Sequence, residues 1–325
     1  MKAKLVLIGG GTGSFNLLSE LKKHPFDITA LVNMADSGGS TGVLRDELGV
    51  LPPGDVRQCL VALSESPQIL RDLFTYRFPN GSTLAGHSFG NLFLSAFEDM
   101  SSGDFAGAIQ LAEQVLNIKG RVLPITLDNC HLVMQTDAGV VKGEHHIDTM
   151  RLPRNERPQL ALSPRATLHA PAEQAIKNAD IIVIAPGDIY TSLGPSLIVD
   201  GVKHALAKSR AKKIYVCNLV NKPGHTDGFT VADYAEEIER LAGLSFLDYV
   251  LYNTERPERG LLHKYEADQE FPVLIDEGQL LEVKYKAVGG KFIADTANQN
   301  KGQRRAAYIR HDAENVVNII CKLLA

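Results

Sequence analysis

The sequence predicts an α/β fold, a doubly wound Rossmann-like α/β/α sandwich, from three observations. The chain opens with a hydrophobic run, a glycine turn and an amphipathic run, KLVLIGGGTGSFNLLSELKK, which is the start of a βαβ unit. Hydrophobic and amphipathic segments alternate again after residue 180. The composition, 44% hydrophobic and 22% charged residues in a chain of 325, is typical of a globular protein with a sizeable core. We therefore expect a single domain over residues 1–325.

The first half of the chain is expected to start the sheet and then to leave it. Residues 3–8 and 27–33 are hydrophobic runs typical of parallel strands, with a helix near 14–23 between them. From about 54 to 118, apolar residues recur at helical spacing, which predicts a helical insertion. From about 121 to 168 the pieces are short and β-prone, with a hairpin around the DAG turn of HLVMQTDAGVVKGEHHI, so we expect a small β-rich subdomain.

The second half of the chain is expected to return to the sheet. Its alternation favours strands at 180–186, 213–220 and 247–253, with helices at 194–208 and 230–242. A last strand at 306–312 and a helix at 313–325 complete the pattern.

Charge and cysteine content exclude several classes of protein. A net charge of −4 gives no electrostatic reason to expect nucleic-acid or membrane-surface binding. No apolar run approaches the roughly 20 residues of a membrane span, and the first strand leaves no room for a signal peptide. The four cysteines, Cys59, Cys130, Cys217 and Cys321, have no paired spacing and are expected to be reduced thiols. We therefore expect a cytoplasmic protein.

The loops that follow the expected strands differ in chemistry from the loops that precede them. The following loops read GGGTGS, NMADSGGSTG, PGDIYTS, NLVNKPGHTDG and NTERP, and they are rich in glycine, hydroxyl, Asp and Asn. The preceding loops read KKHPF, KNA, KSRAKK and LAGLSF, which is ordinary surface. Turn formation alone would enrich both sets alike. The asymmetry therefore predicts a ligand site at the carboxyl edge of the sheet.

The first glycine loop has the features of an anion-binding turn. Its glycines let backbone N–H groups approach a phosphate at a helix N-terminus, and Thr12 and Ser14 can add hydroxyl donors. The dinucleotide fingerprint is incomplete, because Ser14 stands where the third glycine would be, and no Walker lysine follows. A tight turn into a helix is the alternative explanation.

The second glycine loop, NMADSGGSTG, contains a carboxylate and no lysine. A carboxylate among phosphate-binding donors repels the ligand unless it holds a metal or accepts a hydrogen bond. Asp36 therefore suggests either Mg²⁺ coordination or a contact to a sugar hydroxyl. Arg45 and Arg57 could supply positive charge nearby, and Asp55 follows Pro53-Gly54 where capping of a helix is an equally good explanation.

Histidine and serine residues elsewhere carry weaker signals. His145 and His146, with His131 and Cys130, suggest zinc only weakly, because neighbours on an expected strand point to opposite faces. Capping or packing competes with a ligand role for His87, whereas His225 lies in a loop of the chemically rich edge. Ser88 and Ser192 lack the nucleophile-elbow pattern, which argues against a hydrolase.

Six ordered blocks of sequence resemble the CofD-like superfamily, and within it the bacterial YvcK type. They are GGGTG, NMADSGGSTGVLR, PPGDVRQCL, GHSFGNL, APGDIYTSLGPSL and NLVNKPGHTDGF, and they cover nearly the whole chain. The resemblance implies a Rossmann-like fold whose ligand lies across the carboxyl edge. It also implies binding of a UDP-sugar, notably UDP-N-acetylglucosamine, by a regulator needed for cell shape and for growth on gluconeogenic carbon sources. The two glycine loops would then hold two parts of one long ligand.

Two other functions are compatible with parts of this pattern. The CofD branch of the superfamily is a Mg²⁺-dependent transferase that moves a phospholactyl group from a guanylated donor, so the resemblance keeps that activity as the alternative. The segment NLVNKPGHTDGFTVADY follows the YvcK type, but Pro195-Ser196 replaces its usual Pro-Asn. An NAD(P)-dependent oxidoreductase is disfavoured by the missing third glycine and by the second loop. No catalytic residue is assigned, no cofactor beyond Mg²⁺ is implied, and a homo-oligomer is compatible with the sequence.

The loop chemistry and the resemblance together define a set of expected ligand-binding residues at the carboxyl edge, with Asp36 also the candidate metal ligand. They are Gly9, Gly10, Gly11, Thr12 and Gly13; Asn33, Asp36, Ser37, Gly38, Gly39, Ser40, Thr41 and Arg45; Asp55, His87 and Asn91; Gly187, Asp188, Tyr190, Thr191, Ser192 and Ser196; Asn218, Lys222, His225, Thr226 and Asp227; and Asn253.

Overall fold

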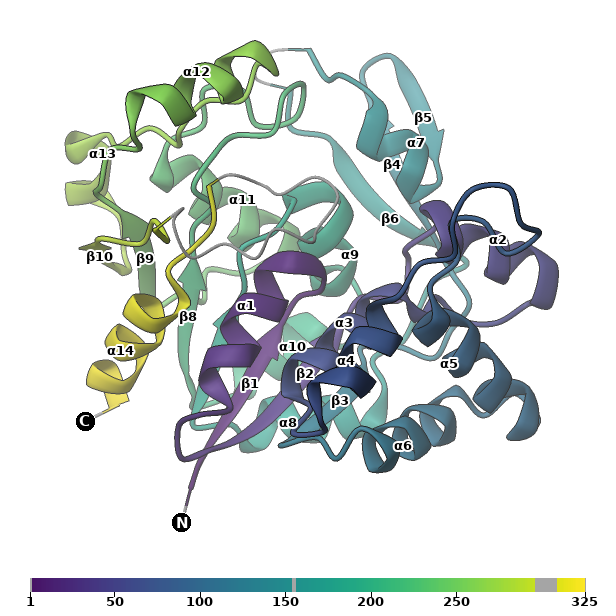
Figure 1. Ribbon diagram of the computed structural model, residues 1–325. Coiled ribbons are helices and arrows are strands. Elements are labelled where there is room, and N and C mark those ends of the chain that lie inside the picture. The colour runs from purple at the N-terminus through teal and green to yellow at the C-terminus, as the bar shows by residue number, and fades with distance from the viewer. Residues whose placement is uncertain (1, 154–155, 296–308, 325) are drawn as a thin grey trace.

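The computed structural model describes residues 2–153, 156–295 and 309–324, with backbone only at 46–48. Its centre is a seven-stranded sheet in the order β10-β9-β8-β7-β1-β2-β3, and every neighbouring pair is parallel (Figure 1). The strands are β1 (Ala3–Ile8), β2 (Phe26–Val32), β3 (Arg121–Pro124), β7 (Ile181–Ile184), β8 (Lys212–Val216), β9 (Tyr249–Asn253) and β10 (Lys286–Gly290). The expected α/β fold is confirmed.

The central strands are hydrophobic on both faces because helices cover both sides of the sheet. All four residues of β7 are buried, as are the last four of β1. On one face α1 (Gly11–Leu21) contacts both α3 (Pro53–Leu63) and α14 (Ala313–Leu324). On the other face α8 (Ala170–Asn178) packs on β1 and β3 and contacts α10 (Val202–Lys208). In Figure 1, α1 and α14 lie in front of the sheet, with α8 and α10 behind it.

The segment of the chain before β3 is helical. It contains α3, α4 (Gln68–Thr75), α5 (Phe89–Met100) and α6 (Phe105–Val115), and α2 (Gly39–Leu48) precedes it. Near the other end of the chain, α11 (Val231–Ala242) follows β8, while α12 (Arg259–Ala267) and α13 (Glu277–Glu282) lie between β9 and β10. In Figure 1 these last two helices lie at the upper left, across from the small sheet.

The β-rich segment differs from the expected 121–168 at its start. β3 pairs in parallel with β2, so it is the edge strand of the large sheet and not part of the subdomain. The small antiparallel sheet is formed by β4 (His131–Thr136), β5 (Gly139–Lys142) and β6 (Gln159–Ser163). The hairpin around the DAG turn is confirmed as β4–β5, but it ends at Lys142, and α7 (Glu144–Thr149) follows. His145 and His146 therefore lie on a helix, and the strand argument used for them was wrong.

Two further expectations need correction. The helix expected at 194–208 is broken into α9 (Gly194–Leu197) and α10, because Gly201 takes a left-handed φ of 106° before α10. A π-turn (Ile189–Leu193) directly precedes α9. Of the strand expected at 306–312, residues 306–308 lie outside the described residues, and in the remainder only an isolated bridge joins His311 to Ile293. The edge strand is instead β10, which the sequence analysis did not predict.

All four cysteines are free thiols, and Cys59, Cys130 and Cys217 are buried. Within the described ranges, no helix combines the length and the apolar character needed to cross a bilayer.

Candidate functional site

The carboxyl ends of β1 and β7 form the topological switch point of the sheet. These strands are neighbours, yet the chain continues from β1 to β2 on one side and from β7 to β8 on the other. The loops that follow them are in direct contact, because a Cβ at Gly13 would lie 2.1 Å from the carbonyl oxygen of Pro186. Open α/β sheets bind ligands in the crevice at such a point.

The first glycine loop is packed against a carboxylate from the insertion. Gly10 is the N-cap of α1, and a Cβ added there would lie 1.9 Å from Oδ2 of Asp55. Gly11 has a left-handed φ of 69°. The Asp55 carboxylate accepts a hydrogen bond from the Gly11 N–H. Asp55 does not cap its own helix, whose N-cap is Pro52, so the capping explanation for this residue is wrong.

The second glycine loop also leads into a helix N-terminus. Gly38 is the N-cap of α2, so Gly39 and Thr41, expected in a loop, lie in its first turn. The Gly38 N–H donates to Oδ1 of Asp36 at 2.9 Å. A Cβ at Gly54 would lie 3.1 Å from Oδ2 of Asp36 and 2.6 Å from the Thr41 hydroxyl. The second loop therefore packs against the first turn of α3, the turn that carries Asp55.

Asp36 interacts with Asp55 and also with Glu144, and the pKa values of all three carboxyl groups are raised. Burial raises the pKa of Asp36, although the hydrogen bond from Gly38 opposes this. Burial and then the charge of Asp36 raise the pKa of Asp55 to about 7. Burial, followed by the charges of Asp36 and Asp148, raises the pKa of Glu144 to about 8. Near neutral pH, protons are therefore shared among groups that are ordinarily fully ionised.

Glu144 was not predicted from the sequence. It lies at the start of α7, where the N–H of His145 also donates to the Ser37 hydroxyl at 3.4 Å. Asp148 follows one helical turn later and forms an ion pair with Lys222. The spacing of Glu144 and Asp148 is helical, and that spacing was the available signal. The hairpin expected at 131–147 placed the first of them on a strand instead.

The residues at this site fit a magnesium ion only in part. Within 2–153, 156–295 and 309–324, no three His, Cys, Asp or Glu side chains gather as a ready metal site. Asp36 and Asp55 offer two carboxylates whose charges interact. Mg²⁺ is commonly held by one or two carboxylates together with substrate phosphates and water. The pair therefore suits Mg²⁺ only when a phosphorylated ligand completes the coordination.

The two expected cations are already bonded within the protein. Arg45 donates from Nε to the Asn129 side-chain oxygen at 3.0 Å and also bonds the Cys130 carbonyl. Arg57 donates to the Asn91 side-chain oxygen at 2.8 Å, and burial, followed by the charge of Arg77, lowers its pKa to about 10. Both arginine side chains therefore stabilise the loops of the site through hydrogen bonds within the protein.

The predicted His87, Ser40 and Asn91 form one hydrogen-bonded group. The Ser40 hydroxyl lies 3.0 Å from Nδ1 of His87 and accepts from the Asn91 amide at 3.2 Å. Ser88, not His87, caps α5. This group ties the first turn of α2 to the start of α5.

A second ionic group lies after β7. Asp188 accepts hydrogen bonds from the N–H groups of Tyr190 and Thr191 at 3.0 and 2.8 Å and so caps the π-turn. Its Oδ2 lies 3.0 Å from Nζ of Lys222 and 3.6 Å from Nδ1 of His225. Burial alone would raise the pKa of Asp188, but His225 and Lys222 hold it well below its usual range. The Asn33 amide reaches the Thr191 carbonyl at 3.4 Å, which joins this group to the second loop.

Several predicted residues shape the loops through their own hydrogen bonds. Asn218 exchanges two bonds with the backbone of Gly187. The side chain of Asp227 accepts from Gly224, and that of Thr226 accepts from Lys222. Asn253 bonds the backbone of Glu255 and Phe292 beyond β9.

Other predicted residues differ in how accessible they are. Tyr190 and Ser196 have no exposed surface, so neither side chain reaches a ligand in this conformation. Thr12 is exposed, and Ser192 is half-buried. The contacts of all these residues with a ligand stay predictions.

Comparison with known proteins places this geometry among relatives. Residues 5–293 match the family described as 2-phospho-L-lactate transferase CofD. The gluconeogenesis factor of Bacillus subtilis is 39% identical over 329 residues, covering 99% of this chain and 98% of that protein. The gluconeogenesis factor of Halalkalibacterium halodurans is 38% identical over 321 residues, covering 98% and 96%. A crystal structure of a UPF0052 family member from Bacillus halodurans superposes with a TM-score of 0.89 at 38% identity, covering 99% of both chains.

Proposed function

This chain belongs to the 2-phospho-L-lactate transferase CofD family, and from that premise we propose that it is a cytoplasmic gluconeogenesis factor that binds a UDP-sugar. The ligand we propose is UDP-N-acetylglucosamine, and the role is regulation of carbon metabolism and cell shape. The relatives named gluconeogenesis factors support this proposed type of protein, because they align with this chain over nearly their whole length.

The observation that carries the proposal is the pairing of two glycine-capped helix N-termini at one switch point. α1 and α2 each begin at a glycine that follows a glycine N-cap without any side-chain cap. The Gly11 N–H is bonded to Asp55, and other N–H groups of these first turns are available to an anion. Both first turns lie beside the carboxylates of Asp36 and Asp55. A ligand with a diphosphate and a polyhydroxylated sugar uses both kinds of group.

The carboxylates set how the diphosphate is held. At neutral pH Asp55 and Glu144 retain protons part of the time, since their pKa values are about 7 and 8. A protonated carboxyl donates a hydrogen bond to a phosphate oxygen, whereas the ionised form repels it. Asp36, next to the Gly38 N–H, is suited to accept a hydrogen bond from a sugar hydroxyl. The site thus recognises a diphosphate and hydroxyls without a lysine in either loop.

A second function is favoured by one observation, the interacting carboxylates of Asp36 and Asp55. In a Mg²⁺-dependent phospholactyl transferase these two residues would hold the metal against the donor diphosphate, and the metal would supply charge neutralisation during transfer. Asp36→Asn separates the two functions. A hydroxyl contact predicts the same loss of UDP-N-acetylglucosamine affinity in magnesium and in EDTA, whereas a metal ligand predicts a loss only in magnesium.

The proposed function is tested by calorimetry on the purified protein with a panel of nucleotides. We expect UDP-N-acetylglucosamine to bind more tightly than UDP, because the sugar adds contacts, and NAD and NADP to bind weakly. GDP and GTP are measured with and without magnesium. Binding of guanine nucleotides in magnesium without binding of uridine nucleotides would replace the regulator with the transferase.

A further inference from the structure

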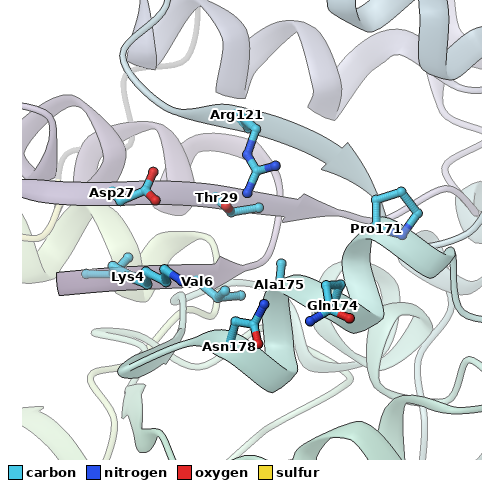
Figure 2. Close-up of a pocket in the computed structure, with 10 residues that line it drawn as sticks. Lys4, Val6, Asp27, Thr29, Arg121, Pro171, Gln174, Ala175 and Asn178 are labelled. Carbon is cyan, nitrogen blue, oxygen red and sulfur yellow. The ribbon is translucent and has the colours of Figure 1, made fainter. Parts of the chain in front are cut away.

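A pocket of about 260 Å³ lies at the amino end of the large sheet, under α8 (Figure 2). Its floor is the surface of β1 and β2, where Val6 and Thr29 are 2% and 4% exposed. Arg121 of β3 pairs in register with Thr29 and forms one wall, and residues of α8 form another. Because the glycine loops lie at the opposite ends of β1 and β2, this pocket is separate from the candidate site.

The polar side chains around this pocket are not engaged with the protein. Within the described parts of the chain, no side-chain hydrogen bond or ion pair is made by Lys4, Thr29, Arg121, Gln174 or Asn178. The guanidinium of Arg121 attracts the Glu113 carboxylate only at longer range, and that carboxylate is bonded to the Val122 N–H. Figure 2 shows the side chains of Arg121, Gln174 and Asn178 lying around a common space.

This contrasts with the carboxyl edge, where Arg45 and Arg57 are both hydrogen-bonded inside the fold. In the part of the chain that the structure describes, this strand arginine, the buried hydroxyl and the two amides have no partners, so they are arranged for a ligand from outside.

The surroundings of the pocket are basic in a protein whose net charge is −4. A neighbouring pocket of about 380 Å³ shares Lys4 and Asp27 with it and adds Lys2 and Lys119. The linings of the two pockets contain four cations, Lys2, Lys4, Lys119 and Arg121, and one carboxylate, Asp27. Two more carboxylates lie close by: Asp180 accepts a hydrogen bond from the Lys4 N–H, and Arg121 attracts Glu113. The local field therefore favours an anion.

We propose that this amino-edge pocket binds a small phosphate monoester that carries hydroxyl groups. A planar guanidinium matches the oxygens of a phosphate, which assigns that group to Arg121. The Asp27 carboxylate and the amides of Gln174 and Asn178 suit hydroxyls. The pocket of about 260 Å³ is smaller than the 300–1,000 Å³ typical of ligand sites, which favours a short metabolite over a nucleotide.

The test is calorimetric titration of the full chain with glycerol 3-phosphate and glucose 6-phosphate, with glycerol, glucose and inorganic phosphate as comparison probes. We expect at least one ester to bind more tightly than inorganic phosphate and the uncharged probes not to bind. Arg121→Gln should weaken that ester about tenfold or more, because a hydrogen-bonded charge is lost. Thr29→Val should weaken it by a smaller factor at unchanged thermal stability.

The matched control is Arg210→Gln, which removes an exposed arginine from the same edge of the sheet, before β8. Its effect should be less than about twofold, because it does not line the pocket. The proposal is overturned if no ester binds at about 10 mM. It is also overturned if inorganic phosphate binds as tightly as the esters, or if both arginine variants weaken binding equally, which is general attraction by surface charge.

Discussion

The two edges of the parallel sheet offer different groups to a ligand: the carboxyl edge offers backbone N–H groups, and the amino edge offers side chains. At the carboxyl edge, the chain brings backbone N–H groups of two helix N-termini close to Asp36, Asp55 and Glu144, whose pKa values are raised. At the amino edge, a pocket is surrounded by cationic and amide side chains that have no partners among the residues that the structure describes. Backbone recognition needs consecutive glycines and leaves a strong trace in the sequence. Side-chain recognition draws single residues from several segments and leaves almost none.

The largest effect is expected from Gly10→Ala, a substitution that changes the carboxyl edge and leaves the amino edge as it is. Gly10→Ala places a Cβ 1.9 Å from Oδ2 of Asp55, so the first loop or α3 must move. We expect the affinity for UDP-N-acetylglucosamine to fall about a hundredfold or more, and overpacking to cost about 1–3 kcal/mol of stability. Calorimetry and thermal unfolding measure the two effects.

The control for Gly10→Ala is a second substitution at Asp55, the residue that the added Cβ would contact. Adding Asp55→Ala to Gly10→Ala should recover most of the lost stability, because the clash is with that carboxylate. Binding of a phosphate ester at the amino edge should not change in either variant. An unaltered affinity of Gly10→Ala for the UDP-sugar would show that α1 does not hold the diphosphate.

The next largest effect is expected in the ionic group after β7, which consists of Asp188, Lys222 and His225. Lys222→Met removes the cation beside Asp188, whose side chain is 13% exposed, and we expect a loss of about 2–3 kcal/mol in the free energy of unfolding. The matched variant Lys177→Met breaks a more exposed pair with Glu173 and should cost less than about 0.5 kcal/mol. Denaturant unfolding near pH 7 compares them, and equal losses would mean that the Asp188 group is not structural.

The stability of the folded protein is expected to depend on pH. The folded-state pKa values of Asp55 and Glu144, about 7 and 8, lie above the ordinary value of about 4 in an unfolded chain. The folded protein therefore holds protons that the unfolded chain has lost between about pH 4 and pH 8, so stability falls as pH rises through that window.

The same ionisation repels a diphosphate. In EDTA the affinity for UDP-N-acetylglucosamine should fall about tenfold between about pH 6 and pH 9. Asp55→Asn, which keeps a neutral side chain, should flatten the profile. A profile that is as steep in Asp55→Asn as in the wild type would assign the titration to another group.

The smallest effect is expected at Thr12, which is exposed on the first turn of α1. Thr12→Ala should reduce the affinity for the UDP-sugar by about 1 kcal/mol, the typical net value of one hydrogen bond. Because the side chain is exposed, the melting temperature without ligand should not move. A shift in the melting temperature with unchanged affinity would give Thr12 a structural role instead.

The sequence predicted the architecture and the chemistry of the carboxyl edge because both depend on local patterns. Buried strands such as β1 and β7 are continuous hydrophobic runs, and the glycine turns follow them directly. The broken helix at 194–208 was missed because its break depends on the φ of Gly201, which neighbouring apolar residues conceal. β10 was missed because its strand, KAVGG, ends in two glycines, which weaken any strand signal.

Tertiary placement explains the remaining differences. Glu144 joins the carboxylates of the glycine loops only because α7 packs against the π-turn, which no local pattern specifies. β3 was assigned to the subdomain because four residues carry no signal of their partner strand. The amino edge was interpreted as ordinary surface, because Arg121, Thr29 and Asn178 stand far apart in the chain.

The most direct test of the account measures the affinity for UDP-N-acetylglucosamine in three proteins: wild type, Gly10→Ala and Arg121→Gln. We predict that wild type and Arg121→Gln bind alike, within about twofold, and that Gly10→Ala binds about a hundredfold more weakly or worse. The reverse pattern, with binding lost in Arg121→Gln and kept in Gly10→Ala, would contradict it by moving the nucleotide sugar to the amino edge. Absence of binding in wild type would contradict the proposed function itself and leave the phosphate-ester pocket to be judged by its own titration.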